Sequence, residues 1–143
     1  MVSIGESMRN DHNHYMSIVE KLAISTEGVR NVRMAACVVY KNKIASFGVN
    51  KFKSHPFQLR FSKMNDCIYI HAETDAIKNA IKVLDVGELR KSNLYICRIK
   101  KISGVDVWGL AKPSVGCKRA IAAFEIKNVY YSDDNKTTKR LEN

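Results

Sequence analysis

The sequence predicts an α/β domain of three layers, α/β/α, with a mixed central sheet between helices. Amphipathic helical segments and apolar segments of strand length follow one another in the order helix, hairpin, helix, strand, helix, strand. The 143 residues suffice for one domain with a real core and are too few for two. We therefore expect a single domain over residues 1–143, with its core at about 11–132.

The first half of the chain predicts a helix and then a hairpin. The helix begins at about Asp11 and ends before Glu27-Gly28. Residues 34–40 are a continuous apolar run, typical of a strand covered on both faces, and residues 44–50 return as its partner. The apolar positions of the helix are Tyr15, Ile18, Val19 and Leu22.

Residues 51–66 are expected to form a long loop that mixes basic and aromatic side chains. Such a mixture suits a phosphate and a base, or a single strand of nucleic acid, and loops of this length are often binding loops. The alternative is that the phenylalanines fill the core and the lysines keep the surface soluble. The residues are Lys51, Phe52, Lys53, His55, Phe57, Arg60, Phe61 and Lys63.

A second helix is predicted over residues 71–84, and Glu73 lies on its apolar stripe, in the first turn. A carboxylate there gains from the helix dipole but loses much of its water, which favours a group that both takes and gives a proton. A surface glutamate is the alternative. The stripe continues through Ala76, Ile77, Ala80, Ile81 and Leu84.

The remaining chain predicts a strand, a helix and a strand. Gly87 marks a break, residues 94–99 form the strand, and residues 100–112 form a second excursion with the sole Trp108. Another strand follows at 129–131, and the polar tail over 132–143 is expected to be mobile or a short exposed helix. The helix opens at Pro113 and buries Cys117, Ala120, Ile121 and Phe124.

The formal net charge of +10 indicates an anionic partner, either a phosphorylated small molecule or nucleic acid. No run reaches membrane-spanning length, and no signal-peptide pattern is present, so we expect no membrane partner. The four cysteines, at 37, 67, 97 and 117, form no C-x-x-C pair. These features predict a reducing, cytoplasmic setting.

Two of the predicted helices begin with potential metal ligands, His71 and Cys117. Zinc takes histidine nitrogen and cysteine thiolate, and two helix dipoles would stabilise an anion beside it. Glu73, two residues beyond the histidine, is close enough to act on a water at that site.

His71-Ala72-Glu73 followed by Pro113-Ser114-Val115-Gly116-Cys117 resembles the zinc-dependent cytidine and deoxycytidylate deaminase family, whose signature is H-x-E and then P-C-x-x-C. The order of elements from about residue 34 to 132 is also similar, and the deoxycytidylate deaminases are the closest in kind. The resemblance implies a cytidine deaminase-like fold, a zinc cofactor, hydrolytic deamination of a cytosine nucleotide and assembly into a homo-oligomer.

The resemblance also implies roles for individual residues. His71 matches the histidine ligand of zinc and Cys117 the second cysteine ligand. Glu73 matches the carboxylate that takes a proton from the attacking water and hands it to the base. Asn50 lies where family members place an asparagine that contacts the sugar, and the backbone around Ala72 would hold the pyrimidine edge.

Ser114 departs from the pattern, because it stands where the family has its first cysteine. A serine hydroxyl is a poor zinc ligand, although serine before a helix is a good N-cap. Three alternatives follow. Zinc is held weakly by His71 and Cys117 with Ser114 or a water. In the second, Cys67 or Cys97 replaces the missing cysteine, and in the third the metal site is lost.

Three functions follow. The leading one is conversion of dCMP to dUMP, since a compact chain with a basic loop fits a small phosphorylated substrate. The second is deamination of a base in single-stranded DNA or RNA, with Phe52, Phe57, Phe61 and Trp108 as stacking platforms. The third, motivated by Ser114, is a catalytically silent protein that binds nucleotide, nucleic acid or a protein partner.

Overall fold

The computed structural model describes residues 4–28, 32–51, 56–61 and 70–142, with the side chains of this part except those of residues 4–10 and 59. Its centre is a six-stranded sheet in the order β2-β1-β3-β5-β6, and β4 pairs with β3. Only the β3–β5 pair among these strands is parallel, so the sheet is mixed, as predicted. The strands are β1 (Arg33–Tyr40), β2 (Lys43–Val49), β3 (Asn93–Ile102), β4 (Val105–Gly109), β5 (Asn128–Ser132) and β6 (Thr138–Arg140).

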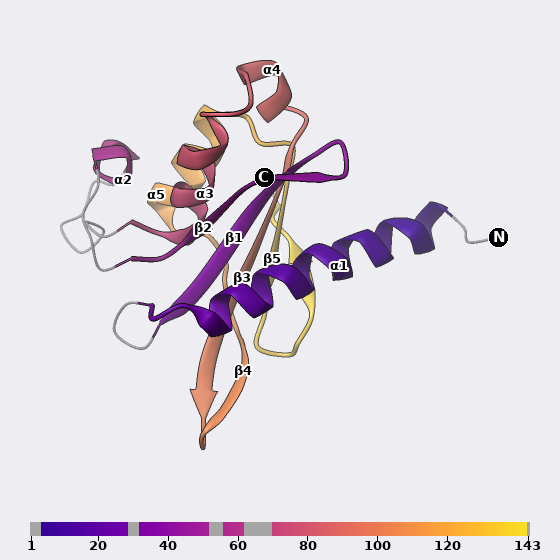
Figure 1. Cartoon of the computed structure of the whole chain (residues 1–143), viewed down its shortest axis with the longest axis vertical. Helices are drawn as coiled ribbons and strands as arrows, with labels where there is room; N and C mark the ends of the chain where they lie inside the picture. The colour runs from indigo at the N-terminus through magenta and orange to yellow at the C-terminus, as the bar shows by residue number, and fades with distance from the viewer. Residues whose placement is uncertain (1–3, 29–31, 52–55, 62–69, 143) are drawn as a thin grey trace.

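Helices cover both faces of the sheet, which confirms the predicted three layers. The long helix α1 crosses one face, and α3 and α5 lie on the other, with α2 and α4 at its margin (Figure 1). No helix within the described ranges combines the length and the apolarity needed to cross a bilayer. The helices are α1 (Ile4–Ser25), α2 (Pro56–Phe61), α3 (Ala72–Ala80), α4 (Val86–Leu89) and α5 (Val115–Ala123).

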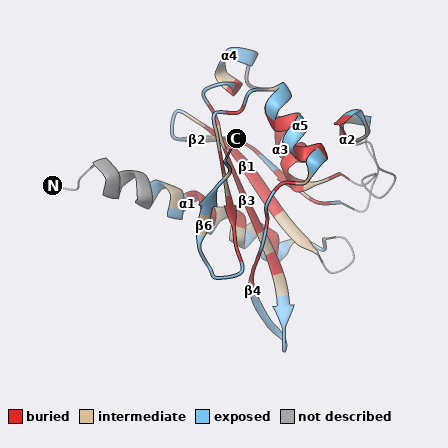
Figure 2. Ribbon diagram, turned by 180° about the vertical axis from the view of Figure 1, so that it is seen from behind, coloured by how far each residue is buried: buried red, intermediate tan, exposed pale blue. Residues whose placement is uncertain are grey.

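The apolar run of β1 is buried on both faces because its side chains alternate between two cores. Ala35, Cys37 and Val39 pack beneath α1. Ala36 and Val38 pack beneath α3 and α5. The buried residues accordingly form a continuous band along the central strands (Figure 2).

The excursion expected over residues 100–112 is largely a hairpin, because the end of β3 reaches Ile102 and β4 returns over Val105–Gly109. The two strands turn at Ser103 (φ 51°) and Gly104 (φ 81°), a left-handed pair typical of a two-residue hairpin. Ser132 joins this hairpin to β5: its buried hydroxyl donates to the Gly109 carbonyl at 2.7 Å and accepts from the Arg98 N–H at 3.0 Å.

In the described part of the C-terminal tail, residues 132–142, the structure has a strand where a mobile tail or a short exposed helix was expected. Residues 138–140 form β6, paired antiparallel with β5. The Asp133 carboxylate organises the turn before it by accepting the N–H groups of Asn135 at 3.0 Å and Thr137 at 2.8 Å. An edge strand held by backbone pairing and a polar turn needs no apolar pattern, so the sequence gives little sign of it.

Two helical boundaries also differ from the prediction. The helix α3 ends at Ala80 rather than at residue 84, and Ile81 is 40% exposed. Gly87 does not mark a break between elements but lies inside α4. The first turn of α4 is fixed by a capping box between Asp85 and Glu88.

Candidate functional site

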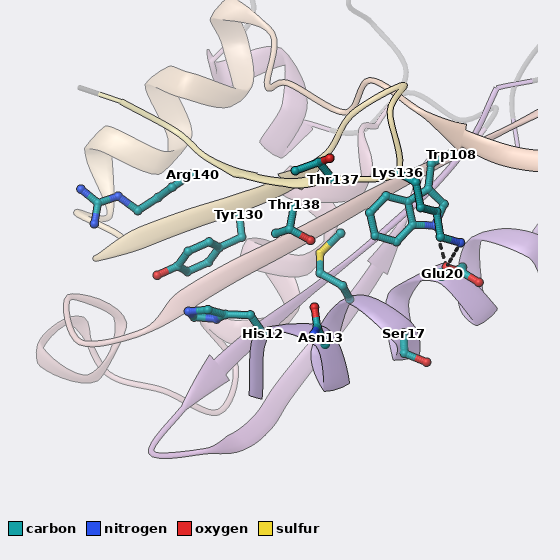
Figure 3. Close-up of a pocket in the computed structure, with 11 residues that line it drawn as sticks. His12, Asn13, Ser17, Glu20, Trp108, Tyr130, Lys136, Thr137, Thr138 and Arg140 are labelled. Carbon is teal, nitrogen blue, oxygen red and sulfur yellow. Dashed lines mark hydrogen bonds and ion pairs between the residues drawn. The ribbon is translucent and has the colours of Figure 1, made fainter. Parts of the chain in front are cut away.

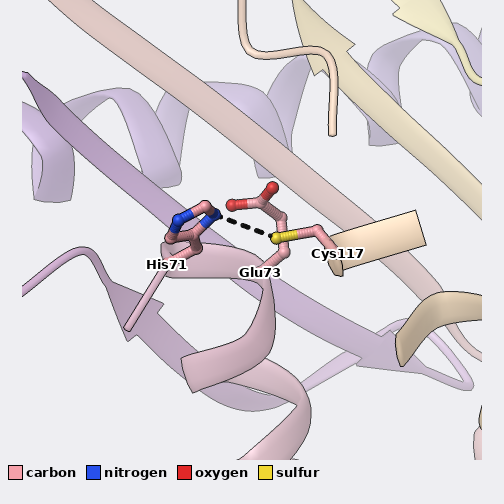
Figure 4. A group of neighbouring side chains, drawn as sticks. All are labelled: His71, Glu73 and Cys117. Carbon is pink, nitrogen blue, oxygen red and sulfur yellow. Dashed lines mark hydrogen bonds between the residues drawn. The ribbon is translucent and has the colours of Figure 1, made fainter. Parts of the chain in front are cut away.

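The first turns of α3 and α5 meet on the same face of the sheet and bring three potential ligands together. His71 is the N-cap of α3, and Cys117 lies in the first turn of α5. The imidazole Nδ1 of His71 is 3.2 Å from the Cys117 sulfur (Figure 4). One ligand atom from each of His71, Glu73 and Cys117 lies within 4.8 Å of the other two.

Glu73 points into this cluster from the second position of α3 (Figure 4). Its side chain is 2% exposed, and its Oε1 atom has no hydrogen-bond partner within the described ranges. A buried carboxylate oxygen normally has a partner, because leaving it without one costs free energy. Glu73 is therefore placed to receive a proton or a ligand from the space beside His71 and Cys117.

Ser114 lies beside His71 and Cys117, and its hydroxyl oxygen is close to a polar atom of each. As the N-cap of α5, its Oγ accepts the Cys117 N–H at 3.4 Å. The same oxygen is 3.5 Å from Nδ1 of His71. The hydroxyl therefore stands where a third ligand beside His71 and Cys117 would be.

The donor set fits a zinc ion. Tetrahedral zinc, with bonds of about 2.0 Å to nitrogen and 2.3 Å to sulfur, separates two such ligands by roughly 3.5 Å. The spacings of 3.2 Å from His71 Nδ1 to Cys117 and 3.5 Å to Ser114 are close to that value. Glu73 Oε1, which has no hydrogen-bond partner among the described residues, adds an acceptor oxygen beside these three groups.

The position of α3 depends on a close approach to β2. A Cβ atom built on Gly48 would lie 2.2 Å from the Ala76 nitrogen and 2.4 Å from the Ala72 oxygen, so only glycine fits. Beside it, the Ser46 hydroxyl donates to the Ala76 carbonyl at 2.7 Å. These contacts fix α3, and with it Glu73, against the sheet.

Asp75 is a site-supporting residue that the sequence analysis missed. Its carboxylate is 2% exposed, accepts the Val49 N–H at 3.1 Å, and pairs with Lys51 at 3.3 Å and Lys78 at 3.0 Å. It thus binds the end of β2 to α3 two residues after Glu73. The only available signal was an acidic residue in the first turn of a buried helix.

Asn50 is buried and bonded to the backbone of the β1 segment. Its amide donates to the Val32 carbonyl at 2.8 Å, and its Oδ1 accepts the Met34 N–H at 2.9 Å. The next residue, Lys51, donates its N–H to the Ile70 carbonyl at 3.2 Å. Asn50 therefore lies beside the segment that leads into His71, and its predicted contact with a sugar stays a prediction.

Several candidate residues do not join the site. Cys97 packs beneath α1, on the other face of the sheet, and burial raises the pKa of its thiol to about 12. Phe57 and Phe61 pack against Phe124 instead of offering stacking platforms, and Trp108 also lies on the α1 face. The predictions for Phe52, Lys53, His55, Lys63 and Cys67 fall outside the described residues.

A separate cleft of about 570 Å³ lies between α1 and the β5–β6 hairpin (Figure 3). At one end, the Trp108 Nε1–H donates to the Glu20 carboxylate at 2.6 Å, and Lys136 pairs with the same carboxylate at 3.3 Å. At the other end, the His12 ring packs on Tyr130 with ring centres 4.2 Å apart. Trp108, proposed from the sequence as a stacking platform, lines this cleft, whereas His71, Glu73, Ser114 and Cys117 do not.

A three-layer α/β/α fold with histidine, glutamate and cysteine at two adjoining helix N-termini is typical of the cytidine deaminase class of proteins. The sequence model for the cytidine and deoxycytidylate deaminase zinc-binding region matches residues 9–133. Because this match spans most of the chain, the protein belongs to that family.

Solved structures share this fold. The dCMP deaminase of cyanophage S-TIM5 in its apo form is 20% identical over 85% of this chain and 82% of that chain, with a TM-score of 0.58. The same enzyme in complex with dCMP and dUMP gives 21% identity, 85% and 79% coverage, and a TM-score of 0.56. Acinetobacter baumannii RibD is 15% identical over 87% of this chain and 28% of that chain, with a TM-score of 0.52. No curated protein matches the chain.

Proposed function

We propose that the protein is a hydrolytic deaminase that converts a cytosine nucleotide to its uracil form, of the dCMP-to-dUMP type. The observation that carries the proposal is the buried Glu73, whose Oε1 is unpartnered within the described ranges and adjoins the His71–Cys117 pair. In such a reaction water adds to C4 of the base, the bond from C4 to the amino nitrogen breaks, and ammonia leaves.

His71 and Cys117 would hold the zinc ion, with Ser114 beside them. Bound there, zinc supplies a Lewis acid that lowers the pKa of water. Glu73 takes a proton from the attacking water and returns it to the base, so that it ends the cycle as it began. Its buried position excludes the solvent that would otherwise compete for that proton.

The substrate would lie against the first turn of α3. The N–H groups of a first helical turn have no partner inside the helix, so the backbone at Ala72 can donate to the pyrimidine edge. Asn50 has amide capacity beyond its two backbone bonds for the sugar. Arg60 of α2 is exposed and available for the phosphate, whereas Lys51 already pairs with Asp75.

Conversion of dCMP to dUMP, followed by ammonia release, tests the proposal. Glu73→Gln keeps the shape of the side chain and removes its proton chemistry, so the rate should fall by about 10²–10⁴-fold. Glu27→Gln, an exposed position, is the matched control and should keep the parent rate. Equal rates for the parent and Glu73→Gln would refute the proposal. Cytidine and a single-stranded oligonucleotide, assayed in parallel, identify the substrate class.

Ser114 supports a second candidate, a catalytically silent protein that binds nucleotide. Its hydroxyl is engaged as the cap of α5, which explains its presence without any metal. If Ser114→Cys gains activity that the parent lacks, the parent is silent. Parent turnover that depends on Glu73, with about one zinc per chain, excludes the silent protein.

A further inference from the structure

The N-terminus of α3 is capped by a side chain from another helix. His71 occupies the N-cap position, but its own side chain makes no capping hydrogen bond, because the imidazole is turned toward Cys117. The first N–H groups of a helix need acceptors from elsewhere. Gln58 of α2 provides one: its Oε1 accepts the His71 N–H at 3.2 Å.

Gln58 is fully buried, and the same oxygen also accepts a hydrogen bond from the Thr74 hydroxyl. Thr74 Oγ1 is in turn 3.1 Å from the His71 carbonyl oxygen. The Thr74 hydroxyl has a single proton and donates to one of these two oxygens at a time, so Gln58 fixes the His71 N–H directly and holds Thr74 beside the His71 carbonyl. A buried amide is costly unless it is bonded, so this arrangement holds its geometry tightly.

The helix that carries Gln58 is held on α5 by other contacts. The Phe57 ring stacks on Phe124 with ring centres 5.9 Å apart and planes 15° from parallel. The Phe61 ring lies 6.1 Å from Phe124, and the Arg119 guanidinium donates to the Phe61 carbonyl at 3.1 Å. The helix α2 thus contacts both helices whose first turns supply His71 and Cys117.

We propose that Gln58 is a positioning residue for the site: it fixes the backbone of His71 so that Nδ1 faces the Cys117 sulfur. The consequence for turnover rests on the proposed function, whereas the positioning itself does not. Residues that orient a ligand from outside the metal's own coordination change metal affinity by about 10–100-fold when they are replaced.

Two measurements test this on the full chain without substrate. The first is hydrogen exchange at the His71 amide in metal-free protein, followed by NMR. The second is zinc affinity by competition with a chelator. Gln58→Met keeps the length of the side chain and removes the strong acceptor. It should speed exchange at His71 by at least about tenfold and weaken zinc binding by about 10–100-fold.

Controls separate positioning from general loss of stability. Gln58→Glu retains acceptor oxygens and should restore protection of the His71 amide. Thr74→Val should show a smaller effect in the same direction. Val19→Ala destabilises the core beneath α1, on the opposite face, and should leave exchange at His71 and zinc affinity near the parent values.

An unprotected His71 amide in the parent would overturn the proposal, even if Gln58→Met failed to fold. So would equal behaviour of Gln58→Met and Val19→Ala in both measurements. If exchange at His71 responds as expected but neither the parent nor any variant binds zinc, the positioning role stands and the proposed function fails. If the parent deaminates dCMP while Gln58→Met keeps the parent's exchange at His71 and the parent's zinc affinity, the function stands and the positioning role fails.

Discussion

The Ser114 hydroxyl and the Cys117 thiol face the same nitrogen of His71, at 3.5 Å and 3.2 Å. The chain therefore keeps the geometry of a three-ligand site while one donor is a weak one. A thiolate binds zinc more strongly than a hydroxyl does, because a thiol loses its proton far more readily.

Ser114→Cys should therefore raise zinc affinity by about tenfold or more, measured by chelator competition. Ser114→Ala is the matched control. It removes the cap of α5 and should cost about 1 kcal/mol of unfolding free energy. If both variants bind zinc with the same affinity, position 114 does not face the metal.

Asn50→Ala should lower the unfolding free energy by about 1–3 kcal/mol, because it leaves the Val32 carbonyl and the Met34 N–H without their partner. Urea denaturation without ligand measures this effect. Asn13→Ala, at an exposed position of α1, should change stability little. A change in KM with unaltered stability would instead assign Asn50 to substrate alone.

Gly48→Ala should destabilise the fold by about 1–3 kcal/mol, since the added methyl group would meet the backbone of α3. Thermal unfolding checks it. Gly87→Ala is matched: its Cβ would meet only the Asp85 carboxylate, at 3.4 Å, so this variant should be neutral or slightly stabilising. Equal stability of the two variants would contradict the close packing of α3 on β2.

His12 should make stability depend on pH. Burial lowers its pKa below the ordinary 6.5, an effect that Asp11 partly offsets, and the ring packs against Tyr95 and Tyr130. Between the lowered pKa and 6.5 the unfolded chain binds more protons than the folded one, so the unfolding free energy falls as the pH decreases through this window. His12→Asn should flatten that decline in melting temperatures, and an unchanged slope would exclude His12 as its source.

The sequence predicts the central strands well, and it brings His71 and Cys117 to two helix starts that the structure places side by side. Apolar runs such as the one in β1 are explicit in sequence, and His71, Glu73 and Cys117 follow a motif that begins two helices. The hairpin of β3 and β4 had a signal in Ser103-Gly104 between alternating apolar residues, which the prediction of a simple excursion did not use.

Residues that act across the fold are harder to predict. Gln58 bonds to the N-cap residue of a helix 13 residues later, and Asp75 holds a strand that ends 26 residues earlier. Neither spacing is a repeat or a motif, so only the packing of α2 and β2 on α3 reveals the contact. The short edge strand β6 is also hard to predict. Its backbone pairing with β5 specifies it, so its side chains carry no apolar pattern.

Trp108 is the sole tryptophan, and its burial beneath α1 gives the protein a built-in optical probe. Its indole contacts Glu20 and Lys136, so its fluorescence reports whether α1, β4 and the β5–β6 turn are assembled. Because the His71 cluster lies on the other face of the sheet, we expect metal bound there to leave this emission largely unchanged. Unfolding can thus be followed by fluorescence at any metal concentration, with site occupancy read independently.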